Sequence, residues 1–174
     1  MLLLLAAMAA PLSAQKQHEM CGACHTERVK DFLTHPHFQK GIECDACHGE
    51  SKAHRTSLGH TEPDKVAAPA EIPALCGGCH PGKEKTTIQA QYLASKHGRL
   101  VVENSKVRAP HCGTCHGVHD VRTGKAMERQ CRRCHDRLPA ACSAAPARQA
   151  ALVCAACHNP HSLTLLAKAG IAKR

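Results

Sequence analysis

Six short stretches of the chain share the pattern Cys-x-x-Cys-His, which can hold a porphyrin. They read CGACH, CDACH, CGGCH, CGTCH, CRRCH and CAACH, beginning at residues 21, 44, 76, 112, 131 and 154. On one helical turn, residues three or four apart share a face. Both thiols can therefore form thioethers with the two vinyl groups of one haem, while the adjoining imidazole faces the iron. The pattern predicts six covalently bound c-type haems.

Each motif supplies the same three side chains. The predicted thioether cysteines are Cys21, Cys24, Cys44, Cys47, Cys76, Cys79, Cys112, Cys115, Cys131, Cys134, Cys154 and Cys157. The predicted proximal iron ligands are His25, His48, His80, His116, His135 and His158.

Other uses of cysteine explain the pattern less well. A structural zinc site groups cysteine and histidine in fours, which leaves the histidine after every second cysteine without a role. A disulfide framework suits an exported protein but does not require that histidine either. Twelve of the thirteen cysteines lie in the motifs. We interpret the remaining one, Cys142, as a spare thiol or an intermolecular disulfide.

Much of the chain resembles the soluble multihaem cytochromes c of the bacterial periplasm. The stretches that carry the resemblance are HPHFQKGIECDACHGESKAH, SKHGRL…APHCGTCHGVHD and CAACHNPH. The similarity is closest to the decahaem electron-shuttle family that feeds outer-membrane conduits and dimethyl-sulfoxide-type reductases, and to the related class III cytochromes. It covers most of residues 18–163, although six motifs are fewer than the decahaem members carry.

An internal repeat points to distal ligands among the other nine histidines. Residues 21–38 and 76–98 both run from Cys-Gly-x-Cys-His to an aromatic-Leu pair, with a histidine four residues after the leucine. A second motif and a further histidine follow each copy. The repeat and the family resemblance together predict the distal ligands His37, His54, His97, His119 and His161.

The sixth distal ligand is left open. The third copy of the repeat has no histidine between His135 and His158, where the other two carry their middle histidine. Met127 and Cys142 are weaker alternatives to an imidazole ligand. The remaining histidine candidates are His18, His35, His60 and His111.

We expect a mostly irregular fold with short α-helices, little or no β-sheet, and haems in place of a conventional core. The chain has no Trp, one Tyr and two Phe, so aromatic side chains bury little area. Residues 15–174 would form one hexahaem domain of three two-haem units, at about 18–60, 73–120 and 128–163. Thr26 is expected to cap a helix before Val29 and Phe32, and Gly98 to end a second one.

The apolar N-terminal segment and the net charge indicate where the protein is located and which partners it could have. Residues 1–14 are too short to span a bilayer and are typical of a signal peptide, so we expect a periplasmic or extracellular protein without a membrane span. The formal charge of +9 would be more than offset by the propionates of six haems. No basic and aromatic residues are interleaved for stacking on bases, so nucleic acid is excluded as a partner.

Two imidazoles saturate a haem iron, which can then only pass electrons. We therefore expect an electron carrier and not an enzyme, with redox proteins as donor and acceptor. It would relay electrons between a membrane donor and a terminal reductase or outer-membrane conduit. A second interpretation is a reductase with one open haem at His135. A third is a polymerising extracellular wire, whose self-association lets a neighbouring chain donate the missing ligand.

If haem forms the core, the chain should not fold without it. A variant with the motif cysteines replaced by serine is expected to show no cooperative thermal transition by circular dichroism, whereas the haem-loaded protein melts cooperatively. A cooperative melt of the serine variant would show that the polypeptide has a sufficient core of its own.

Overall fold

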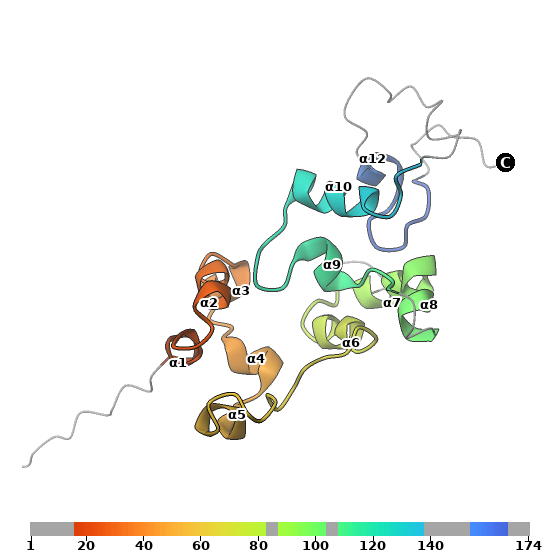
Figure 1. Ribbon diagram of the computed structural model, residues 1–174. Coiled ribbons are helices and arrows are strands. Elements are labelled where there is room, and N and C mark those ends of the chain that lie inside the picture. Colours follow the sequence, from red (N-terminus) through yellow and green to blue (C-terminus); the bar gives the residue numbers. More distant parts are fainter. Residues whose placement is uncertain (1–15, 83–86, 104–107, 138–153, 167–174) are drawn as a thin grey trace, which may run out of the picture.

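Short helices joined by turns make up the computed structural model, which describes residues 16–82, 87–103, 108–137 and 154–166 (Figure 1). No β-sheet occurs in these segments, and one isolated antiparallel bridge joins His158 to Leu165. The expectation of a helical and irregular fold with little or no sheet is therefore confirmed for this part of the chain. The expected signal peptide at 1–14 and Cys142 lie outside the described residues.

The described helices fall into three groups along the chain, one for each pair of motifs. In the first unit they are α1 (Gln17–Gly22), α2 (Thr26–Phe32), α3 (Pro36–Gln39), α4 (Cys44–His48) and α5 (Lys52–Thr56). The second unit has α6 (Ile72–Gly77), α7 (Ile88–Ala94), α8 (Lys96–Glu103) and α9 (Cys112–His116). The third has α10 (Gly124–Arg132) and α12 (Cys154–Cys157).

The same pair of helices recurs in each unit. The first motif of a unit begins in the last turn of a longer helix, and the second motif forms a short helix of its own. These two helices contact each other in all three units, as α1 with α4, α6 with α9, and α10 with α12. Figure 1 shows α9 between α6 and α10, and both contacts are made. The second and third units are therefore in direct contact.

A glycine follows the second motif in the first two units, and the backbone requires it. Gly49 and Gly117 adopt φ of 71° and 79°, which residues with a Cβ rarely adopt. A Cβ on Gly117 would also overlap the backbone carbonyl of Asp120. In both units the carbonyl of the motif histidine accepts a hydrogen bond from the loop that follows, from Lys65 N to His48 O and from Arg122 N to His116 O.

The helices α2 and α8 each differ from expectation in one detail. Thr26 is the first residue of α2 and not its cap, because His25 occupies the N-cap and the Thr26 hydroxyl donates to Gly22 O. Gly98 does not end a helix but is buried inside α8, where it lies against the end of α7. The cap of α7 is Thr87, whose hydroxyl accepts a hydrogen bond from Ala90 N at 3.1 Å.

Large apolar side chains in the interior are few. Within the described segments, Phe32 and Val101 are the buried large hydrophobic residues, and Pro73 is fully buried. Nine large hydrophobic side chains are exposed instead, among them Leu58 at 84%. Because folding must offset about 1–2 kcal/mol of backbone entropy per ordered residue, this polypeptide interior is a weak source of stability. A search of the same segments finds no helix long and apolar enough to cross a membrane.

Replacing Gly98 with alanine tests the close approach of α7 and α8. The added Cβ would overlap the Tyr92 carbonyl oxygen and lie 2.6 Å from Leu93 Cα, so the backbones must separate. We expect Gly98→Ala to lower the free energy of unfolding by about 1–3 kcal/mol in chemical denaturation of the haem-loaded protein.

The matched control is Gly78→Ala, which converts CGGCH to the CGACH found at residue 21. Its Cβ would meet nothing closer than Leu75 O at 3.6 Å, so we expect little change or a slight gain in stability. Equal midpoints for the two variants would contradict the packing described for Gly98.

Candidate functional site

Ten of the fifteen histidines form five facing pairs. In every pair, one imidazole belongs to a Cys-x-x-Cys-His motif and the other is one of the five predicted distal ligands. The ring centroids lie 5.8–6.2 Å apart. The pairs are His25 with His54, His80 with His37, His48 with His119, His135 with His97, and His116 with His161.

The separation of the rings suits two nitrogen ligands on opposite sides of one metal. A metal–imidazole bond is about 2.0–2.1 Å long, so two opposed nitrogens lie about 4 Å apart. The Nε2 atoms of His37 and His80 are 3.5 Å apart. Three of the pairs are stacked with interplanar angles of 12°, 15° and 17°. The other two pairs are tilted, at 35° and 37°, so the five pairs share one ring separation, which is suited to a metal between the rings.

Two of the paired imidazoles are held by a backbone carbonyl at Nδ1. The Nδ1 of His54 lies 2.7 Å from Thr61 O, and that of His48 lies 3.1 Å from Lys65 O. A neutral imidazole that donates through Nδ1 presents Nε2 as the unprotonated, metal-binding nitrogen. The carbonyls thus select the tautomer and the orientation that iron ligation requires.

Burial favours the neutral form of the distal imidazoles. It lowers the pKa of His97, and the positive charges of His135 and Lys96 add to the effect. It also lowers the pKa of His161, with the facing His116 as the second cause. Only a neutral imidazole can bind a metal, so the lowered pKa values favour the form of His97 and His161 that is able to bind one. The two rings of a facing pair also repel each other when both are protonated.

The pairs link different units of the repeat. The middle histidines His37 and His97, each the second residue of α3 or α8, face the first motif of the following unit. The end histidines His119 and His161 face the second motif of the preceding unit. Only the pair of His25 with His54 lies within one unit. Each unit therefore completes the sites of its neighbours.

The first cysteines of the two motifs in a unit also lie together. Burial and then the neighbouring Cys21 raise the pKa of Cys44 to about 12. A hydrogen bond with Cys112 raises the pKa of Cys76. Cys131 and Cys154 repeat this arrangement in the third unit. The sulfurs are free in all twelve described cysteines.

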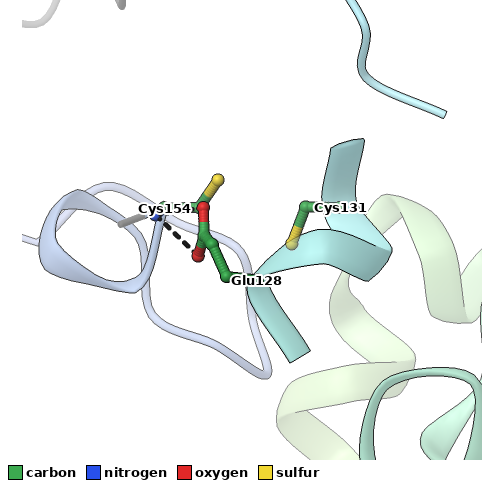
Figure 2. Close-up of side chains that lie close together, drawn as sticks. All are labelled: Glu128, Cys131 and Cys154. Atoms are coloured by element: carbon green, nitrogen blue, oxygen red, sulfur yellow. Dashed lines mark hydrogen bonds between the residues drawn. The ribbon is translucent and has the colours of Figure 1, made fainter. Parts of the chain in front are cut away.

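A carboxylate joins the cysteines of the third unit, as Figure 2 shows. Ligand atoms of Glu128, Cys131 and Cys154 lie within 4.8 Å of one another. The Glu128 carboxylate accepts a hydrogen bond from Cys154 N, at 2.9 and 3.0 Å to its two oxygens. Because the same cysteine pair occurs in the other two units, we interpret this group as part of the repeat and not as a separate metal site.

Sequential motifs from different units are neighbours as well. Burial and then the charges of Cys76 and Cys79 raise the pKa of Cys47, which places the second motif beside the third. In the same way, Cys131 contributes to the raised pKa of Cys115 and so lies beside the fourth motif. Together with the cysteine pairs inside each unit, these electrostatic interactions link the six motifs in the order of the sequence.

The four histidines that lie outside both the motifs and the pairs do not face a motif imidazole. His18 is buried, and its Nδ1 lies 2.9 Å from both carboxylate oxygens of Glu43. His35 is buried against Phe32 and accepts a hydrogen bond from His37 N. His111 precedes α9, and His60 is exposed in the loop after α5.

The motif histidine without a facing imidazole is His158, not His135. The sequence places the break of the repeat after His135, but His97 from the second unit faces that ring with centroids 5.9 Å apart. All fifteen histidines lie in described segments, and none forms a ring pair with His158. The exchange between units, which the sequence analysis did not foresee, explains the difference.

No protein-family model, curated protein or solved structure matches the chain. The interpretation of the histidine pairs therefore depends on their geometry and on the chemistry of the motif.

His18 offers a test that separates structural from ligating histidines. It holds Glu43 at the start of α4 through its backbone N–H and its ring, and its ring packs edge-on against Phe38. We expect His18→Ala to lower the unfolding free energy by about 1–3 kcal/mol, because the partly buried Glu43 carboxylate loses its bond to the His18 ring and keeps only the backbone N–H.

The control His60→Ala removes an exposed imidazole and should change stability by less than about 0.5 kcal/mol. Both variants should leave the electron paramagnetic resonance spectrum of the ferric protein unchanged. A new high-spin signal in His18→Ala would instead identify His18 as an iron ligand.

Proposed function

We propose that the chain is a hexahaem c-type cytochrome that transfers electrons and carries out no substrate chemistry at the five paired sites. The observation that carries this proposal is that five motif histidines each face a second imidazole at one common separation. Haem c bound at these sites would supply one-electron redox centres.

The residues around the motifs fit haem in three respects. The motif cysteines and histidine lie on or at the end of short helices, which puts both sulfurs and the imidazole on one side. A cavity of about 360 Å³ adjoins Cys47 and is lined partly by Val66 and Leu75. The small apolar interior leaves a need for buried area that six porphyrins would meet.

At the five paired sites the polypeptide would hold the iron rigidly and keep substrate away from it. Both imidazoles of a pair would bind the iron, which would leave no position open to a reacting molecule. The carbonyls of Thr61 and Lys65 fix His54 and His48 and stop these rings from turning away. A centre that keeps the same ligands in both oxidation states reorganises little, and little reorganisation favours fast electron transfer.

The row of neighbouring motifs supports transfer along the chain. Contacts between cysteines of sequential motifs bring each attachment site beside the next one. Porphyrins attached to such sites would be near neighbours, so electrons could move between them in steps. The proposed carrier would accept and donate electrons at the ends of this row through redox partner proteins of the periplasm or cell exterior.

Zinc and disulfide interpretations agree less well with the geometry. Across the described segments, one group of three or more potential metal ligands is compact enough for an ion, and it contains no histidine. Disulfides between the paired first cysteines would leave the second cysteine and the histidine of every motif unused. Neither alternative explains why motif histidines face non-motif histidines.

The pairing is tested by counting haems and their spin states in distal variants. The parent protein should contain six haems per chain by the pyridine haemochrome assay. Replacement of His97 with alanine should add about one high-spin ferric haem per chain by electron paramagnetic resonance, because His135 loses its facing ligand. His35→Ala, which removes a buried histidine without a motif partner, should add none.

Two results would count against the proposal. A chain matured in a cytochrome c-producing host that carries no haem would overturn it outright. A full complement of haem with identical spin states in the parent and His97→Ala would show that His97 is not an iron ligand.

A further inference from the structure

The second motif of a unit receives its facing histidine from the next unit. His48 in the first unit faces His119 of the second, and His116 in the second unit faces His161 of the third. The second motif of the third unit ends in His158, and the 174 residues contain no histidine beyond His161. By the rule that the other units follow, none of the three units supplies a facing imidazole to His158.

The imidazole of His158 is nevertheless held by a backbone carbonyl, as are two of the paired imidazoles. Its Nδ1 lies 3.1 Å from Leu163 O, which corresponds to the anchoring of His48 by Lys65 O. The loop that supplies this carbonyl is itself fixed, since Asn159 N donates to Thr164 O and Leu166 N donates to Cys157 O, both at 2.8 Å. His158 thus has the tautomer and orientation of a proximal ligand.

Exposed apolar side chains lie in the sixth motif and in the loop after it, beside polar ones such as Asn159 and Ser162. Leu165 and Leu166, on the loop that closes over the motif, expose 42% and 37% of their surface. Ala155 and Ala156 inside the motif are also exposed. An apolar, accessible environment admits a small uncharged ligand more readily than an ion, which would lose its hydration.

On the basis of the proposed function, we propose that the haem of Cys154, Cys157 and His158 has a ligand position that no imidazole of the described residues fills and that binds a small uncharged donor from outside. The chemical class is that of carbon monoxide, nitric oxide or an imidazole nitrogen. The other five haems, each between two imidazoles, would exclude such ligands.

Carbon monoxide titration of the reduced, haem-loaded protein tests this site. We expect about one molecule bound per six haems, measured by difference spectroscopy with haem counted independently. His161→Ala should raise the ratio to about two, because it removes the imidazole that faces His116. His60→Ala, the matched control, should leave it at about one.

A double variant, Cys154→Ser with Cys157→Ser, assigns the site. It should retain five haems and bind no carbon monoxide. Should this variant fail to fold, the parent protein gives a second readout, since its ferric high-spin signal should convert to low-spin on addition of imidazole. A high-spin signal that imidazole does not change would contradict an accessible position.

The outcomes separate this inference from the proposed function. Six haems with no carbon monoxide bound at any protein concentration would mean that a side chain such as Met127 or Cys142 fills the position, and would overturn the inference alone. Binding that develops only on dilution would support it and identify a second copy of the chain as the source of the ligand. A chain without haem would overturn both proposals.

Discussion

The rest of the structure depends on five pairs of imidazoles that face each other at one common separation. Bringing these rings together costs free energy, because they are partly buried and repel each other when both are protonated. Few large apolar side chains are buried nearby to hold the helices together. A shared metal group would supply the attraction that the side chains lack, so cofactor binding and folding would be a single event.

Exchange of ligands makes the units of the repeat depend on each other. His97 leaves the second unit to face His135 in the third, while His119 of the second unit faces His48 in the first. Loss of one such histidine would affect the unit that carries it and the unit that it completes. The same exchange explains why the two ends differ from the middle. At the first unit His54 faces His25 of its own unit, and at the third no imidazole of the described residues faces His158.

The repeat also accounts for features that look irregular in a single unit. The group of Glu128, Cys131 and Cys154 resembles an isolated metal site, but the cysteine pair recurs in the other units. The middle histidine missing after His135 would correspond to a ligand for the first motif of a following unit, and no seventh motif is present in the sequence. Both features follow from the position of the third unit in the row.

The six motifs, the five histidines that face them and the predominance of short helices can all be predicted from the sequence. These features depend on local spacing, which helical i to i+4 geometry and comparison of the repeats make visible. Which histidine faces which motif depends instead on the tertiary structure. Pairing joins residues 29 to 71 positions apart, such as His25 with His54 and His48 with His119, and no local pattern encodes such a contact. For the same reason the sequence suggested His135 as the motif histidine without a facing imidazole, whereas the structure shows that it is His158.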